Sequence, residues 1–159
     1  MFTLEKSGKT LYGEKMKNKI IAVSGGFDPV HHGHVKMIQD AAKHGNVMVI
    51  VNSDAWLTRK KGYVFMPWQE RAYIMGCIKG VTTVVSVDDS DGTVCEALSK
   101  YKPDMFANGG DRKTNNTPEM DVCNENGIEM LWNIGGEKIQ SSSDLVSNAK
   151  ANKGASHGQ

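Results

Sequence analysis

Five short apolar runs, joined by segments too long for hairpins, constrain the fold of this chain most strongly. The runs lie at residues 19–23, 47–51, 81–87, 105–107 and 128–132. Apolar residues at helical spacing predict helices at 33–42, 67–78, 94–101 and 118–125, and one more that begins near Ser142. Parallel strands need crossover connections of this length, and such crossovers are right-handed. The pattern therefore predicts an α/β fold with an open, doubly wound sheet of five parallel strands.

The balance of charges argues against two broad classes of partner. Lys and Arg number 19 and Asp and Glu number 18, which gives a formal net charge of +1. This balance predicts no long-range attraction to nucleic acid or to a membrane surface. No apolar run approaches the roughly 20 residues of a membrane span. Binding of a small anionic ligand is compatible with this net charge, because such a ligand needs only a local cluster of cations.

The length and composition predict one globular domain. The chain has 159 residues, of which 39% are hydrophobic and 23% charged. We expect a domain over residues 19–150, after an N-terminal extension at 1–18 whose charges interrupt any signal sequence. Residues 151–159 are polar and are expected to form a flexible tail. Within the domain, we expect residues 53–66 to be a loop that leads to a helix starting at Pro67.

The cysteines favour a reducing compartment. Cys77, Cys95 and Cys123 are scattered singly, without a CxxC pair. This spacing argues against a disulfide framework and against a zinc ribbon. We therefore expect a cytoplasmic protein.

Glycine and aspartate gather where three of the predicted strands end. SGGFD follows the first strand, NSD the second and NGGD the fourth. In open parallel sheets, ligands bind beyond the carboxyl ends of the strands. The sequence therefore predicts a binding site at this edge.

The stretch SGGFDPVHHGH, residues 24–34, is the most informative part of that edge. Gly33 falls in the first turn of a predicted helix, where glycine costs about 1 kcal/mol relative to alanine, so we expect a tight turn or a close backbone approach. His31 and His34 share a helix face beside unpaired N–H groups that attract anions, whereas His32 points away from it. We interpret this as a phosphate pocket. Capping or surface histidines and a metal site are the alternatives, although no cysteine or H-E-x-x-H motif supports a metal.

Residues 25–34, GGFDPVHHGH, resemble the GxFDxxHxGH signature of the nucleotidyltransferase superfamily. The resemblance implies a Rossmann-like fold with helices on both faces of the sheet, and transfer of a nucleotidyl group from a nucleoside triphosphate. His31 and His34 would then be catalytic, contacting the triphosphate and stabilising the transferring phosphoryl group. The rest of the motif would shape the loop on which the nucleotide lies: Gly25, Gly26, Phe27, Asp28 and Gly33.

Arg59-Lys60-Lys61-Gly62 places three cations in a row after the second predicted strand, on the side of the histidines. By itself, such a run is usually a solvated basic turn. Members of the superfamily that act on glycerol phosphate or heptose phosphate carry a lysine-rich loop here. The resemblance therefore implies that Lys61, as a catalytic residue, and Lys60, as a nucleotide-binding residue, clamp the triphosphate.

Ser141, Ser142 and Ser143 open the last predicted helix. Ser141 and Asp144 form an S-x-x-D capping box, which accounts for two of the polar residues and leaves a further serine without a capping role. The stretch resembles the superfamily's ISTT or ISST-x-I-R motif, which binds the β- and γ-phosphates, and it departs from that motif at Gln140 and Val146. We assign the three serines to nucleotide binding.

Two further motifs extend the resemblance. Asn108-Gly109-Gly110-Asp111 is similar to the GGD of heptose-phosphate adenylyltransferases, which implies that Gly109, Gly110 and Asp111 line the nucleotide and base pocket. A glycine turn with a capping aspartate is the alternative. Asp54 in VNSD and Arg71 in PxxxR match positions that the resemblance assigns to the acceptor. The alternative role of Asp54 is a helix cap, and the alternative for Arg71 is a surface position on its helix.

The resemblance covers about residues 19–150 and is closest to the nucleotidyltransferase domain of bifunctional heptose-phosphate enzymes, followed by glycerol-3-phosphate cytidylyltransferases. It implies transfer of a nucleoside monophosphate to a sugar or polyol phosphate with release of pyrophosphate, as in ADP-heptose or CDP-glycerol formation. Nicotinate-mononucleotide adenylyltransferase activity and a non-catalytic nucleotide-binding module are the alternatives. Mg²⁺ is expected with the triphosphate and not through a set of protein ligands. Related enzymes commonly dimerise, and the choice between ATP and CTP stays open.

Overall fold

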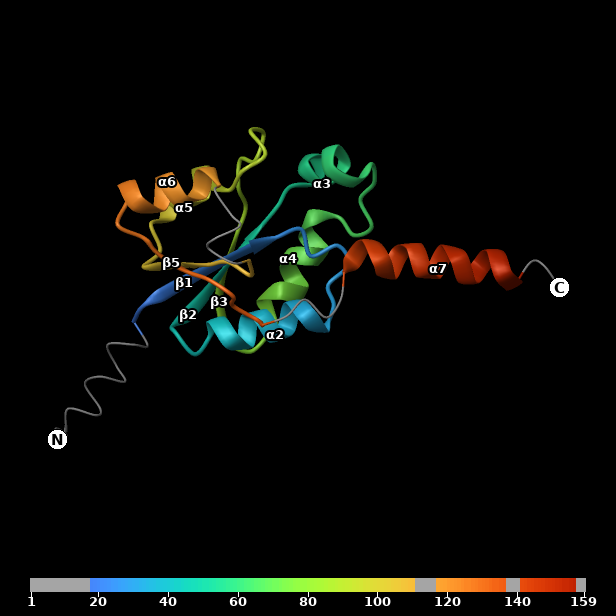
Figure 1. Cartoon of the computed structure of the whole chain (residues 1–159), viewed down its shortest axis with the longest axis horizontal. Coiled ribbons are helices and arrows are strands. Elements are labelled where there is room, and N and C mark those ends of the chain that lie inside the picture. The colour runs from blue at the N-terminus through green and yellow to red at the C-terminus, as the bar shows by residue number, and fades with distance from the viewer. Residues whose placement is uncertain (1–17, 111–116, 137–140, 157–159) are drawn as a thin grey trace.

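The computed structural model describes residues 18–110, 117–136 and 141–156. Within this part of the chain, five strands form one parallel sheet in the order β3-β2-β1-β4-β5 (Figure 1). The strands are β1 (Ile20–Gly25), β2 (Asn46–Val51), β3 (Val81–Val85), β4 (Met105–Ala107) and β5 (Glu129–Leu131). The predicted α/β class with five parallel strands is confirmed, and the fold is Rossmann-like.

Helices cover both faces of this sheet. Figure 1 shows α2 (His32–Ala41) and α4 (Trp68–Gly76) against one face, with α5 (Cys95–Tyr101) and α6 (Pro118–Glu125) against the other. Two more helices, α3 (Asp54–Lys61) and α7 (Ser142–Ser156), lie beyond the carboxyl ends of the strands. The edge that the glycine and aspartate clusters mark is therefore flanked by helices.

Alternate residues of the central strands enter two separate cores, because successive side chains of a strand point to opposite faces. Ile21 and Val23 of β1 pack in the core that includes Ile38 of α2 and Met75 of α4. Ala22, between them, packs in the other core with Leu98 of α5. Covering both faces requires strands that are apolar without alternation, and this requirement accounts for the continuous run at residues 47–51.

The structure corrects the expectation that residues 53–66 form a loop, because α3 occupies most of this segment. The hydroxyl of Ser53 accepts a hydrogen bond from the Trp56 N–H at 3.0 Å and caps the helix. Gly62 ends it in the left-handed conformation, with φ of +84°. Leu57 is the buried residue of α3, so the apolar periodicity by which the other helices were predicted is missing here.

The last helix extends past the residue at which we expect the domain to end. The boundary predicted at residue 150 falls inside α7, and residues 151–156, expected to be flexible, continue this helix. The expected extension lies almost entirely in residues 1–17, outside the described part of the chain. Among the described residues, no helix combines the length and the apolar character needed to cross a membrane.

Candidate functional site

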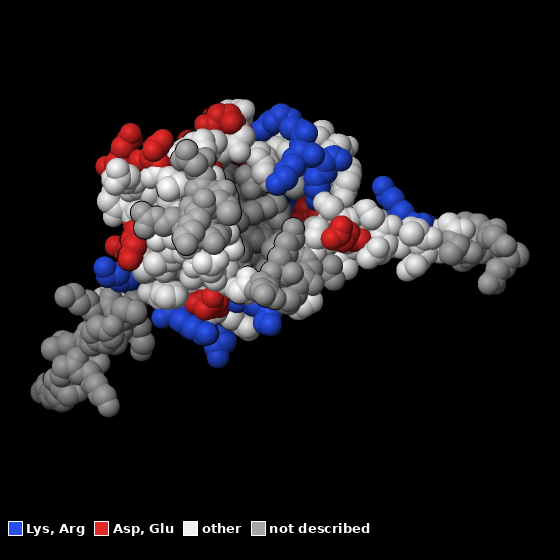
Figure 2. Space-filling model, in the orientation of Figure 1, with Lys and Arg blue, Asp and Glu red and all other residues white. Residues whose placement is uncertain are grey.

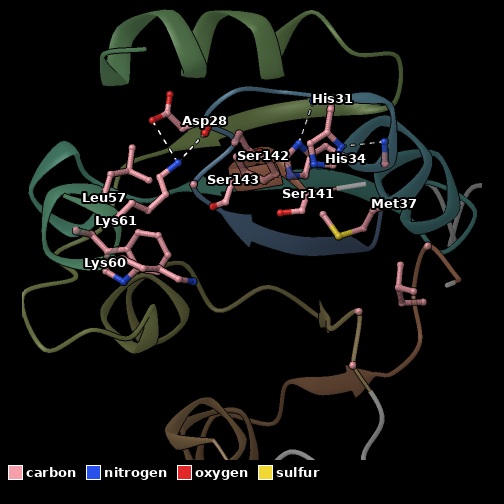
Figure 3. Close-up of a pocket in the computed structure, with 18 of the residues that line it drawn as sticks. Asp28, His31, His34, Met37, Leu57, Lys60, Lys61, Ser141, Ser142 and Ser143 are labelled. Carbon is pink, nitrogen blue, oxygen red and sulfur yellow. Dashed lines mark hydrogen bonds and ion pairs between the residues drawn. The ribbon is translucent and has the colours of Figure 1, made fainter. Parts of the chain in front are cut away.

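A cavity of about 630 Å³ lies at the carboxyl ends of the strands. Five parts of the chain form its wall: the loop after β1 with the start of α2, the α3 helix, the loop after β4, the loop after β5, and the start of α7 (Figure 3). The lining residues are Gly26, Phe27, Asp28, His31, Gly33, His34, Met37, Trp56, Leu57, Lys60, Lys61, Gly109, Gly110, Ile134, Gly135, Gly136, Ser141, Ser142 and Ser143.

The histidines and the serines, more than 100 residues apart in the sequence, line this same cavity (Figure 3). The Ser142 hydroxyl donates to the carbonyl of Pro29 at 2.7 Å, so the first turn of α7 is fastened to the loop that precedes His31. The two groups that the sequence assigned to a triphosphate therefore lie within reach of one ligand.

The backbone determines which nitrogen of each imidazole can donate to a ligand. His31 caps α2, and its Nδ1 accepts from the Gly33 N–H at 3.1 Å. In return, His34 Nδ1 accepts from the His31 N–H at 3.2 Å. An imidazole nitrogen that accepts carries no proton, so in the neutral rings the proton sits on Nε2. Both histidines are thus held in the form that donates from Nε2.

The pKa of His34 lies far below that of an exposed histidine. Burial of the ring lowers it from 6.5 to about 4, and the neighbouring His31 adds to the shift. The two rings stack with their centroids 3.8 Å apart, and the Phe27 ring meets His34 edge-on at 4.9 Å. At neutral pH, His34 is therefore an uncharged hydrogen-bond donor. His32 is exposed and lies outside the cavity lining, as its position in the motif predicts.

Lys60 and Lys61 reach the cavity from the last turn of α3, opposite Met37 of α2 (Figure 3). Lys61 Nζ donates to the carbonyl of Asp28 at 2.7 Å and lies 3.6 Å from its carboxylate. This carboxylate is buried and accepts from the N–H groups of Phe65 and Met66 at 2.7 and 2.6 Å. Asp28 therefore joins the loop after β1 to the segment after α3, and it holds Lys61 in place.

Lys60 is placed differently. Its ammonium lies 4.5 Å from the centroid of the Trp56 ring, a favourable cation–π contact. The two residues are one helical turn apart, and both line the cavity. Figure 2 shows Lys and Arg side chains gathered over α3, beside a hollow in the surface, with Asp and Glu gathered over α5 and α6. The rim at α3 is thus positive although the chain as a whole is almost neutral.

The structure does not bring Asp54 and Arg71 into the cavity. Arg71 is fully buried, and its guanidinium donates to the carbonyls of Gly26, Asn52 and Met66 at 2.7 to 2.9 Å. The same guanidinium donates to the Asp54 carboxylate at 2.6 Å. In this arrangement Arg71 binds three backbone segments and is not a surface arginine, whereas the contact of Asp54 and Arg71 with an acceptor stays a prediction.

One other predicted site residue lies elsewhere. Gly25 ends β1 outside the cavity lining, and a Cβ at this position would meet the Phe27 ring at 3.0 Å. A side chain at this position would press on that ring, so Gly25 has a role in packing. Asp111 lies outside the described residues.

Sequence reasoning missed six lining residues: Met37, Trp56, Leu57, Ile134, Gly135 and Gly136. Gly135 and Gly136 carried a recognisable signal, because adjacent glycines after a strand are typical of a turn. Gly135 has φ of +92°, and a Cβ there would lie 3.1 Å from Met37 Cα. Hydrogen bonds join this turn to the NGG loop: Ile134 N–H donates to Asn108 and Asn133 N–H to Gly110. The other four residues become part of a site only through tertiary packing.

The described residues contain no group of three or more His, Cys, Asp or Glu side chains placed to hold a metal ion. Asp28 contributes the carboxylate among the described lining residues, and it is already paired with Lys61 and two N–H groups.

Comparisons with known proteins agree with this geometry. A family model described as cytidylyltransferase-like matches residues 22–141. The chain is 35% identical over 114 residues to the bifunctional protein HldE of Nitratiruptor sp., which covers 70% of this chain and 24% of that protein. It is 34% identical over 128 residues to HldE of Citrobacter koseri, covering 79% and 25% respectively. The chain thus spans about a quarter of the length of these relatives.

A solved structure has the same fold. The lipopolysaccharide core biosynthesis protein from Thermoplasma volcanium superimposes with a TM-score of 0.59 at 22% identity, covering 72% of this chain and 93% of that one. At this level of identity, the likeness concerns the fold alone.

Proposed function

Because the chain belongs to the cytidylyltransferase-like family, we propose that it transfers a nucleoside monophosphate from a nucleoside triphosphate to a sugar or polyol phosphate and releases pyrophosphate. One observation carries the proposal: His31, His34 and Ser141–Ser143 line a single cavity, with two lysines on its rim. The order of motifs favours a product of the ADP-heptose type over one of the CDP-glycerol type.

The reaction needs no general base from the protein. A phosphate monoester has a second pKa of about 6 and is mostly dianionic at neutral pH. One of its oxygens attacks the α-phosphorus, a new P–O bond forms, and the bond from the α-phosphorus to the bridging oxygen breaks, so that pyrophosphate leaves. The main obstacle is the meeting of two polyanions, which preorganised donors and cations overcome.

Each part of the cavity wall has a role in this scheme. The Nε2–H groups of His31 and His34 donate to phosphate oxygens as negative charge moves toward the leaving group. Lys60 and Lys61 neutralise the triphosphate from the opposite side. The hydroxyls of Ser141 and Ser143, with backbone N–H groups at the start of α7, bind the terminal phosphates, while the Ser142 hydroxyl, which donates to Pro29, holds this turn in place.

The glycine turns suit the nucleoside. Gly109, Gly110, Gly135 and Gly136 leave room for a ligand to approach the backbone, and Ile134 adds an apolar surface. No charged side chain stands among these residues. Backbone groups can recognise the edge of either adenine or cytosine, so ATP and CTP both stay in the proposal.

Mg²⁺ is part of the proposal as a partner of the triphosphate, whose charge it neutralises when bound. The three cysteines are free thiols, and a reducing, cytoplasmic compartment suits such a protein. A homodimer stays a prediction, to be checked by light scattering of the purified chain.

The test is pyrophosphate release from each nucleoside triphosphate, with Mg²⁺ and a panel of sugar and polyol phosphates. Release that depends on one triphosphate and one acceptor supports the proposal and names both substrates. Nicotinate mononucleotide belongs in the panel, because release with it alone selects the adenylyltransferase alternative. Triphosphate binding without release from any pair, at high enzyme concentration, would indicate a non-catalytic binding module.

A further inference from the structure

Asp89 is a buried carboxylate outside the cavity. Its side chain is 3% exposed, and it lies in the loop after β3, which the sequence did not connect with the site. A buried carboxylate is costly unless hydrogen bonds satisfy it. All of the hydrogen bonds described for this carboxylate come from the segment that leads into α3.

Three donors converge on the carboxylate. Asn52 Nδ2 and the Ser53 N–H donate to Oδ2 at 3.0 and 2.8 Å, and the Ser53 hydroxyl donates to Oδ1 at 2.6 Å. Since that hydroxyl gives its proton to Asp89, a lone pair is left to accept from the Trp56 N–H. Asp89 thereby orients the residue that caps α3.

The same loop also binds the middle and the far end of α3. Arg59, in the last turn, donates to the Asp89 carbonyl at 2.8 Å. The Trp56 indole donates to the Gly92 carbonyl at 3.4 Å. Contacts to both ends and the centre of one short helix restrict its sliding and its rotation.

Outside this loop, α3 is held by Leu57 in the core, by the Arg71–Asp54 pair at its start and by the Lys61–Asp28 pair at its end. It has eight residues, of which Leu57 is buried. A helix of this length is marginal in isolation, so its position depends on its tertiary contacts. Lys60 and Lys61 extend from its last turn into the cavity, and a shift of the helix would move both ammonium groups together (Figure 3).

We propose that Asp89 is a positioning residue, which holds α3 so that Lys60 and Lys61 are preorganised to bind the triphosphate. The inference rests on the proposed function for its ligand. In the absence of Asp89, binding must immobilise a looser helix and two long side chains, and that ordering lowers affinity.

The test compares Asp89→Asn with Asp88→Asn. Both variants lose one negative charge from the same loop, but Asp88 is exposed and its carboxylate accepts from Ser90 and makes no contact with α3. Hydrogen exchange of the backbone amides of residues 54–61 reports on α3 without any ligand. We expect faster exchange in Asp89→Asn and exchange like the wild type in Asp88→Asn.

A double-mutant cycle separates positioning from a general loss of stability. Tripolyphosphate binding is measured by calorimetry on the full chain, with Asp89→Asn made in the wild type and in a Lys60→Met, Lys61→Met background. We expect a loss of roughly fivefold in the wild type and no further loss in the lysine-free background. Equal losses in both backgrounds, or unchanged exchange in α3, would overturn the proposal.

A second variant guards against failure to fold. Ser53→Ala removes only the hydroxyl between Asp89 and Trp56. It should speed hydrogen exchange in α3 and weaken tripolyphosphate binding as Asp89→Asn does, but by less. Exchange and binding like those of the wild type would count against the proposal. If the wild type neither binds tripolyphosphate nor releases pyrophosphate, the proposed function fails, and with it the role of Asp89 in ligand binding. The exchange comparison still decides whether Asp89 holds α3.

Discussion

His34 combines two tasks in one ring. Its Nδ1 accepts the His31 N–H at the start of α2, while its Nε2 carries the proton that a ligand can receive. The first task supports the helix and the second supports the proposed chemistry. Variants that keep one nitrogen position and lose the other can therefore separate the two.

His34→Asn and His34→Ala form such a pair. The asparagine side chain can keep an acceptor near Nδ1 but has no group at Nε2, and alanine has neither. We expect kcat/KM for pyrophosphate release to fall by about 10² or more in both, as when one donor to a developing charge is removed. The free energy of unfolding should fall clearly only in the alanine variant. His32→Ala is the control, and equal activity of all three variants would remove His34 from the mechanism.

The lowered pKa of His34 predicts a dependence of stability on pH. Between pH 6.5 and about 4, the unfolded chain binds a proton at His34 that the folded protein does not accept. Unfolding therefore takes up protons, and stability falls as the pH decreases through this window. We expect His34 to contribute about 2 kcal/mol to the free energy of unfolding at neutral pH. This is less than the full pKa shift would give, because the ring is partly open to solvent.

Urea unfolding at pH 7.5 and pH 5 measures this effect. The informative quantity is the difference between wild type and His34→Gln, because this difference isolates the contribution of His34. The variant should lose less stability on acidification than the wild type does. Identical losses would mean that the imidazole is not held in its neutral form.

At the scale of elements, the turn after β5 depends on close backbone approach. Gly135 and Gly136 both have positive φ, but they differ in the space around them. A Cβ at Gly135 would lie 3.1 Å from Met37 Cα, whereas a Cβ at Gly136 meets nothing within 4 Å. Comparing alanine substitutions at the two positions therefore separates the effect of a clash with α2 from the strain of a positive φ.

Gly136→Ala should cost about 1 kcal/mol of stability, from the left-handed conformation alone. Gly135→Ala carries the same strain and must also push α2 away from the turn, so we expect a larger loss of stability and weaker triphosphate binding. Unfolding midpoints and calorimetric affinities of the two variants check this. Equal values for both variants would show that the backbone at Met37 shifts without cost to make room for the added Cβ.

Elements also differ in how far the sequence revealed them. The strands at residues 47–51 and 105–107 were predictable because a short, continuous apolar run is typical of a strand that is covered on both faces. Helix α3 was missed although Ser53 and Gly62 are ordinary cap residues, because its polar sequence has no apolar stripe. The carboxylate that stabilises α3 lies 36 residues beyond Ser53 in the chain, and local pattern reading cannot detect such a contact.

At the scale of the whole molecule, Arg71 joins segments that the chain separates. Its guanidinium binds carbonyls after β1, after β2 and before α4, together with the Asp54 carboxylate. A buried group with this many partners contributes mainly to the unliganded fold. The cavity floor and the base of α3 both depend on it.

Arg71→Lys tests this assignment. Lysine keeps the charge but cannot bridge several carbonyls in one plane, so we expect a loss of about 3 kcal/mol in unfolding free energy without any ligand. Arg71→Met should lose at least as much. Unchanged stability, with a higher KM only for the acceptor phosphate, would instead favour the acceptor contact predicted from the PxxxR motif.

The linear sequence by itself determined the class of fold and the edge of the sheet at which the cavity lies. Apolar runs and their spacing specify parallel strands, and the motif at residues 25–34 places imidazoles at a helix start, because both depend on interactions between near neighbours in the chain. Only the tertiary structure decided which polar groups line the cavity and which are bound by other parts of the protein. Asp28, Arg71 and Asp89 bind other parts of the protein, since buried charges must find partners wherever the folded chain supplies them.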